Sequence, residues 1–219
     1  MIADQLKAVL ATITEDVTLI AVSKTKPVSA VLEAYNAGQR HFGENKVQEM
    51  ELKHDALPKD IHWHMIGHLQ SNKVKYIAPF VHLIHSVDSL KLLQEINKQG
   101  EKNKRVIKCL LQFHIAEEET KFGLSLSEAA NLLNSAEYAE LKNCEIVGVM
   151  GMASFTEDQN KIQNEFRSLK ALFDTLKSDY FEEQASFKEI SMGMSGDYKI
   201  ALTEGSTMVR VGSSIFGSI

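Results

Sequence analysis

The chain has 219 residues, of which 44% are hydrophobic and 24% are charged, and its formal net charge is −5. This composition is that of an ordinary soluble globular protein, and its acidic balance excludes the broad basic surface that attracts nucleic acids and anionic membranes. Cys109 and Cys144 lie far apart in apolar surroundings, which argues against a disulfide framework or a zinc knuckle and suits a reducing compartment.

The first predicted element is an N-terminal helix with an apolar stripe of Leu6, Val9, Leu10 and Ile13. The start of the chain contains Asp4 and no continuous apolar run, so it lacks the pattern of a signal peptide. Nowhere do about 18 apolar residues run together, as a membrane-spanning helix requires. We therefore expect a cytoplasmic protein that binds neither membranes nor nucleic acids.

Short apolar runs predict the strands of a parallel sheet. Several are apolar at nearly every position, which is typical of strands with both faces buried. The predicted strands cover residues 19–23, 40–43, 61–66, 81–86, 106–113, 145–150, 187–191 and 208–211.

Helical patterns separate these runs. An apolar stripe over residues 31–35 is expected to end at Gly38, a plausible residue for a helix C-terminus. Asp88 is expected to cap a second helix that Gly100 closes. A longer stripe over residues 162–176 predicts a long helix near the C-terminal end.

Strands that alternate with helices predict an α/β protein with a parallel sheet. Eight such units in so short a chain favour a closed (β/α)8 TIM-type barrel over an open doubly wound sheet, because the barrel needs at least about 200 residues. The motifs GxxxxGK[ST], GxGxxG and GxSxG are absent, which argues against P-loop, Rossmann and serine-hydrolase proteins. With no linker in the sequence, we expect one domain over residues 1–219.

A lysine follows the first predicted strand. In barrels of this kind the functional groups lie at the C-terminal ends of the strands. Lys24 would therefore stand at the rim of a pocket, where its amine could form a Schiff base. Lys26 has the same strand parity, so alternation alone does not choose between the two lysines.

Loops of small residues follow the last two predicted strands, at residues 191–197 and 212–214. Phosphate sites favour these two loops, and Ser195 could cap the next helix, whose free N–H groups would face an anion. Arg210 lies within the last strand. A buried cation is rarely left unpaired, so Arg210 either pairs with an internal carboxylate or faces the pocket and meets a ligand.

The histidines predict no metal site. His62 and His64 are two apart on a strand and share a face, and His68 follows, but no acid or cysteine at ligand spacing completes a set. We interpret them as core or pocket-wall residues. His82 and His85 have opposite strand parity, so we predict no role for them.

Six segments match one known pattern. The chain resembles the pyridoxal phosphate homeostasis protein family, whose members are small barrels with the alanine racemase-type N-terminal fold. The matching segments follow one another in the family's order. They are AVSKTKP at 21–27, HFGEN at 41–45, WHMIGHLQSNK at 63–73, MGMS at 192–195, GSTMVRVG at 205–212 and IFG at 215–217.

This resemblance implies that pyridoxal 5′-phosphate is the cofactor, held as an internal aldimine on Lys24, with Arg210 facing the pyridine nitrogen. The other cofactor-binding residues that it implies are Asn45 in the pocket wall and Ser195, Gly212 and Ser213 at the phosphate. Lys121 matches a basic loop position of the family to which we assign no role. Lys46 departs from the family, which often has tyrosine there.

Three functions fit these residues. The first is a protein that carries or buffers pyridoxal phosphate without catalysing a reaction. The second is an amino-acid racemase, but the racemases that this barrel resembles take a second base from an added domain that we expect this chain to lack. The third is a lysine-dependent aldolase without a cofactor. We predict the first, with no catalytic residue, as a monomer whose partners are the cofactor and apoenzymes that depend on it.

Overall fold

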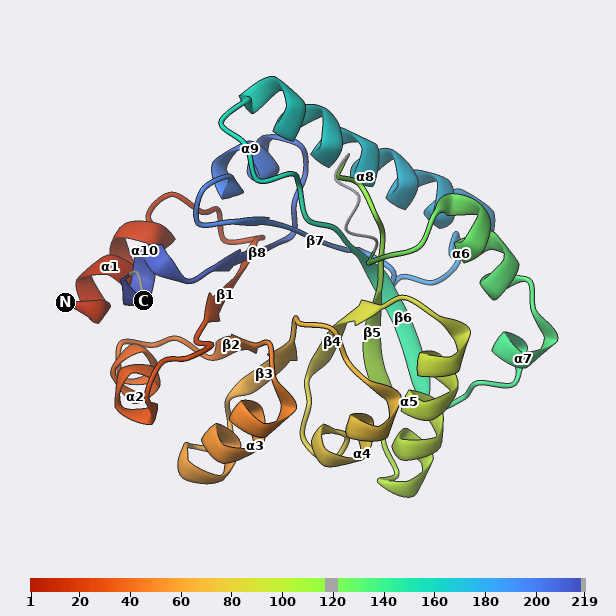
Figure 1. Cartoon of the computed structure of the whole chain (residues 1–219), viewed down its shortest axis with the longest axis horizontal. Coiled ribbons are helices and arrows are strands. Elements are labelled where there is room, and N and C mark those ends of the chain that lie inside the picture. The colour runs from red at the N-terminus through yellow and green to blue at the C-terminus, as the bar shows by residue number, and fades with distance from the viewer. Residues whose placement is uncertain (117–121, 218–219) are drawn as a thin grey trace.

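Parallel strands close into a barrel in which each strand pairs with the next along the chain and β8 pairs with β1 (Figure 1). The computed structural model describes residues 1–116 and 122–217, which contain eight strands. This confirms the predicted (β/α)8 barrel. The strands are β1 Thr18–Val22, β2 His41–Glu44, β3 His62–Met65, β4 Leu83–Val87, β5 Ile107–Gln112, β6 Cys144–Met150, β7 Glu189–Met194 and β8 Met208–Val211.

Helices surround the barrel (Figure 1). The predicted extra N-terminal helix is α1, which packs beside α10 so that the two ends of the described chain lie together. Among the described residues, no helix is both long and apolar enough to span a bilayer. The helices are α1 Ile2–Leu10, α2 Val28–Asn36, α3 Val47–Ala56, η1 Ser71–Lys73, α4 Val74–Ile77, α5 Leu90–Lys102, α6 Leu126–Leu133, α7 Ala136–Ala139, α8 Gln159–Tyr180, α9 Tyr198–Thr203 and α10 Ser213–Phe216.

The two faces of the strands build two apolar layers. Outward residues such as Phe42 and Trp63 pack against the helices in one large core. The middle of the barrel is closed by a second, smaller cluster, so it is a packed core and not a pore. This inner cluster consists of Ile20, Leu83, Leu110, Val147, Met150 and Met208.

Two helix boundaries differ from the prediction. Ser89 caps α5 in place of Asp88, because its Oγ accepts a hydrogen bond from the amide of Leu92 at 3.3 Å. The helix also runs past Gly100, where a Cβ would lie 2.4 Å from the carbonyl oxygen of Asn143. That glycine therefore permits close packing and does not end the helix.

The stop at Gly38 is confirmed. α2 ends at Asn36, and Gly38 has φ +104, a conformation in which other residues are strained. In β7 the structure extends the prediction by three residues, to Met194, across a register shift against β8. Gly193 lies within this shift with φ +96, which bends the end of β7 toward the loop that follows.

Candidate functional site

The predicted site residues gather on one side of the barrel. They belong to β7, β8, β1 and β2, which are consecutive neighbours in the closed sheet. Because all strands are parallel, their C-terminal ends meet at one mouth, which we call the upper mouth. Here lie Lys24 after β1, Asn45 after β2, Ser195 after β7, Gly212 and Ser213 after β8, and Arg210 within β8.

Lys24 stands in a tight turn directly above β1. The amide of Lys26 donates to the carbonyl of Ser23 at 3.0 Å, which closes the turn, and Lys24 is exposed on it. Thr25 has φ 64, an outlying conformation for a β-branched residue, and its amide donates to Glu49 at 2.8 Å. Strain of this kind persists where the surrounding structure fixes it, often at functional sites.

The structure separates the two lysines that strand parity did not. The ammonium group of Lys26 donates to the carbonyl of Gly217 at 3.0 Å, which ties it to the C-terminal segment. In β1, Ile20 belongs to the inner cluster, and alternation sends Val22 and Lys24 toward the same inner side. Lys24 is thus the lysine whose side chain is left available at the mouth.

A buried ion pair supports the turn from below. Lys53 from α3 donates to a carboxylate oxygen of Glu44 at 2.6 Å and to the carbonyl of Ser23 at 2.7 Å. The hydroxyl of Ser23 donates to the same Glu44 oxygen at 2.6 Å. Burial raises the pKa of Glu44, and the hydrogen bonds from Lys53 and Ser23 oppose that rise. The pair fixes the ends of β1 and β2 to α3.

Sequence reasoning missed this pair. Glu44 was part of a matched motif without an assigned contact, and Lys53 lies in the middle of a polar helix sequence where a solvated side chain is expected. The only signal was the acidic residue at the end of a short apolar strand, since such a residue is rarely buried without a partner.

The loops after β7 and β8 are joined at Ser195. Its Oγ accepts a hydrogen bond from the amide of Gly212 at 3.1 Å. The expected cap is therefore wrong, because Asp197 is the N-cap residue of α9 and accepts instead from the amide of Met194 at 2.5 Å. Gly212 also lies close to β1, where an added Cβ would be 3.2 Å from the carbonyl oxygen of Val22.

Arg210 is a buried cation inside the barrel. Its guanidinium donates to Ser191 Oγ at 2.6 Å and to the carbonyl of Gly151 at 3.1 Å, which uses two of its five N–H groups. Burial lowers its pKa to about 10, against the attraction of Asp197, so it stays charged at neutral pH. Within residues 1–116 and 122–217 no carboxylate lies within 4.0 Å of it. Of the two predicted alternatives, the internal ion pair is not formed.

A chain of hydrogen bonds leads from Arg210 through the barrel. Ser191 Oγ bonds His85 Nδ1 at 2.9 Å, His85 Nε2 bonds His64 Nδ1 at 2.9 Å, and His64 Nε2 bonds His41 Nδ1 at 2.9 Å. We call His41, His64 and His85 the histidine chain. His64 is a core residue as predicted, whereas His85, to which the sequence assigned no role, is a central member.

The histidine chain consists of neutral imidazoles at pH 7. Burial, followed by the neighbouring histidines, holds the pKa of His64 well below its ordinary value, and burial with the charge of Arg210 does the same for His85. Burial also lowers the pKa of His41 and of the nearby His82 to about 4.

We expect the free energy of unfolding to fall as the pH is lowered from about 6.5 to about 4. Between these values the unfolded chain protonates these histidines and the folded chain does not, so acid favours unfolding. With His41 and His82 discounted for partial exposure, the loss from pH 7.5 to pH 5 should be about 2 kcal/mol or more. Urea unfolding at both pH values measures it. The raised pKa values of Glu44 and Asp197 act in the opposite sense, and a flat profile would contradict the expectation.

Two further predicted positions complete the mouth. Asn45 is half-buried, and its backbone lies against Gly67, where an added Cβ would be 2.5 Å from the Asn45 carbonyl oxygen. Lys46, the departure from the family pattern, is exposed as the N-cap residue of α3. Lys121 lies outside the described residues.

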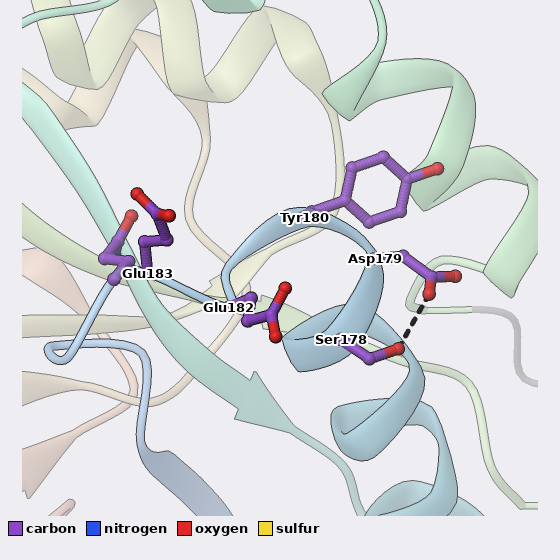
Figure 2. A pocket seen from close by; sticks show the side chains of 6 residues that line it. Ser178, Asp179, Tyr180, Glu182 and Glu183 are labelled. Atoms are coloured by element: carbon purple, nitrogen blue, oxygen red, sulfur yellow. Dashed lines mark hydrogen bonds between the residues drawn. The ribbon is translucent and has the colours of Figure 1, made fainter.

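Two surface hollows are separate from these residues. One, of about 450 Å³, lies between the Thr25–Val28 segment and α3, and neither Lys24 nor Arg210 lines it. Figure 2 shows the other, of about 510 Å³, at the C-terminal end of α8. Its carboxylates make it unsuitable for a phosphate. It is lined by Ser178, Asp179, Tyr180, Glu182, Glu183 and Gln184.

Comparisons with known proteins give one consistent result. The family described as alanine racemase, N-terminal domain, matches residues 1–219. The pyridoxal phosphate homeostasis protein of Aquifex aeolicus is 41% identical over 201 residues, covering 91% of this chain and 86% of that protein. The counterpart from Escherichia coli K12 is 37% identical over 208 residues, covering 93% and 86%.

Solved structures give the same family and fold. PipY of Synechococcus elongatus without PLP has a TM-score of 0.92 at 35% identity, covering 99% of this chain and 100% of PipY. PipY with PLP bound has a TM-score of 0.89 at the same identity and coverage. Alanine racemase from Bartonella henselae shares the fold, with a TM-score of 0.74 at 17% identity, over 99% of this chain and 58% of the racemase.

Proposed function

This chain belongs to the pyridoxal phosphate homeostasis protein family, within the alanine racemase N-terminal domain class, and we propose that it binds pyridoxal 5′-phosphate at the upper mouth and carries or buffers it. Its relatives bear that name and PipY has been solved with PLP bound. The proposal includes one binding domain over residues 1–219, a cytoplasmic location, a monomeric state and transfer to apoenzymes that need the cofactor.

Arg210 carries this proposal. It is a charged group with 4% exposure that donates to a hydroxyl and a carbonyl, and no carboxylate of the described residues lies within 4.0 Å of it. Such an unbalanced buried cation is costly unless a ligand supplies an acceptor or negative charge. Pyridoxal phosphate offers both, through its ring nitrogen and its phosphate. The donor set at the upper mouth therefore fits the cofactor.

The other residues divide the remaining contacts. Lys24 would attach the cofactor's aldehyde through its amine as a Schiff base, and Asn45 would line the pocket. Ser195, Gly212 and Ser213 would hold the phosphate where the loops after β7 and β8 meet. When bound, the cofactor supplies an aldehyde and an electron-accepting ring for amino-acid chemistry.

Arg210 favours a carrier over an enzyme. A guanidinium donates hydrogen bonds and does not accept them. Its charge opposes a proton on a ring nitrogen beside it, because two like charges would be in contact. A ring without that proton withdraws electrons weakly, so the residues of this site stabilise little negative charge on a bound amino acid. We assign no catalytic residue.

Binding and turnover measurements test this function. Pyridoxal phosphate should bind far more tightly than pyridoxal, and Ser195→Ala should weaken its binding by about 0.5–2 kcal/mol, as for the loss of one hydrogen bond. Common amino acids added to the loaded protein should turn over far more slowly than about 1 s⁻¹, the lower end of ordinary enzymes. Equal affinity for pyridoxal phosphate and pyridoxal would show that the phosphate site is wrongly assigned. A turnover rate above that limit would refute the proposal that the protein is a carrier.

A further inference from the structure

Three histidines meet at the end of the barrel opposite the upper mouth, which we call the lower mouth. His41 begins β2 and His62 begins β3, directly opposite each other in the pairing of these strands. His82 precedes β4, and its amide donates to the carbonyl of Trp63 at 2.9 Å, which holds it beside β3. One ring nitrogen of each histidine lies within 4.8 Å of the other two.

The rings of these three histidines contact one another. The rings of His62 and His82 stack at 4.4 Å, and those of His41 and His62 meet edge to face at 4.6 Å. Over the described ranges of the chain, the ring nitrogens of His62 and His82 make no hydrogen bond. Each neutral imidazole has one nitrogen with a lone pair that can accept a hydrogen bond or bind a metal ion, so the lower mouth brings several such lone pairs together.

His41 shows how one ligand is prepared. Its Nδ1 is bonded to His64 Nε2 at 2.9 Å, which leaves Nε2 as the nitrogen that can bind a metal ion. His64 is fully buried and is held in turn by His85. Metal-binding histidines normally engage their second nitrogen in this way, because the outer partner fixes the ring and its proton.

We propose that His41, His62 and His82 bind one divalent transition-metal ion of the zinc type at the lower mouth, with solvent completing the coordination. Three imidazoles and no carboxylate favour zinc and its neighbours over calcium and magnesium, which prefer oxygen. This site goes beyond the proposed function, since it shares no ligand with the upper mouth. It also replaces the sequence expectation of no metal site.

The three ring nitrogens are near enough for small side-chain rotations to bring them onto one ion. Zinc–nitrogen bonds of about 2.0–2.1 Å place ligand nitrogens about 3.4 Å apart, so the rings must turn inward by about an ångström. His62 is exposed and has room for that rotation. Lys108 and Arg105, whose charges act on His82, both oppose a cation at this mouth. Lys108 is exposed and can extend into solvent, whereas Arg105 is held by the carbonyls of Ala78 and Val81.

Zinc titration of the untagged protein, stripped with a chelator and free of pyridoxal phosphate, tests the proposal by calorimetry at pH 7.5. We expect one ion per chain, and cobalt in its place should give the visible absorption of a tetrahedral site. His62→Ala and His82→Ala should each weaken binding by more than about 100-fold, beyond the 10–100-fold cost of losing an outer partner. Lys108→Glu should strengthen it, by removing a cation and adding a carboxylate.

His68→Ala is the matched control, because His68 is an exposed histidine near Asp88 on the loop after β3. It should leave the zinc affinity unchanged. Thermal unfolding of every variant checks that the barrel is intact. The proposal is overturned if the wild-type protein binds no zinc at micromolar concentrations, or if the double variant His62→Ala/His82→Ala binds it as well as the wild type.

Discussion

Lys24→Ala is expected to abolish covalent attachment of pyridoxal phosphate while leaving the protein folded. The proposed attachment uses the amine of this residue, and no other group of the site replaces it. Lys24 is exposed in a turn, so its removal leaves no cavity in the core. The visible absorption of the loaded protein measures the attachment, and mass spectrometry after borohydride reduction locates the modified peptide.

Lys26→Ala is the control for this result. The two lysines lie two residues apart in one loop, but the ammonium group of Lys26 is bonded to the carbonyl of Gly217. This variant should keep the absorption and the label on Lys24. A label found mainly on Lys26 or Lys121 of the wild-type protein would show that the attachment point is misassigned.

Lys53→Met should destabilise the fold by about 3–5 kcal/mol, because it leaves Glu44 charged and buried without its cationic partner. Glu44 has no exposed surface, and one of its carboxylate oxygens, Oε2, already lacks a hydrogen-bond partner among the described residues. The same change releases the carbonyl of Ser23, which Lys53 holds beneath the Lys24 turn. Urea unfolding at pH 7 measures the loss.

The double variant Glu44→Gln/Lys53→Met separates charge from packing. It removes both charges, so most of the stability lost in Lys53→Met should return. If the double variant were as unstable as the single one, the pair would act through packing, and the buried charge would not be the cause. Cofactor attachment measured on both variants shows whether the turn still presents Lys24.

The architecture could be predicted because parallel barrel strands are marked by local pattern. Strands buried on both faces are short apolar runs, and all of the predicted runs overlap the strands of the structure. The ends of the helices were harder to predict. Ser89 and Asp88 are both good caps, and only the hydrogen bond to Leu92 decides between them.

Contacts between residues that are distant in the sequence could not be predicted in the same way. The sequence alone suggests that Lys53 is an ordinary lysine on a helix surface. The fold places it under Ser23 and Glu44, where it is buried. His82 was set aside for its parity, yet it lies just before β4, where strict alternation has not begun. Parity also left Lys24 and Lys26 equivalent, and a contact with the far end of the described chain separates them.

The histidine chain has a direction, which follows from the chemistry of neutral imidazole. Each ring carries one proton, so it donates on one side and accepts on the other. If His41 carries its proton on Nδ1, then His64 and His85 must each carry theirs on Nδ1, and the last proton points at Ser191. If Ser191 donates to His85 instead, every ring reverses, and the proton of His41 moves to Nε2.

Intermediate arrangements would set two donors or two acceptors against each other in a buried space, where an unmade hydrogen bond costs about 1–3 kcal/mol. The rings therefore reverse together. One arrangement leaves a lone pair on His41 at the lower mouth, and the other covers it with a proton. The positions of the three ring protons thus link the two ends of the barrel. Whether Ser191 donates or accepts determines which nitrogen of His41 carries the proton, although no backbone atom has to move.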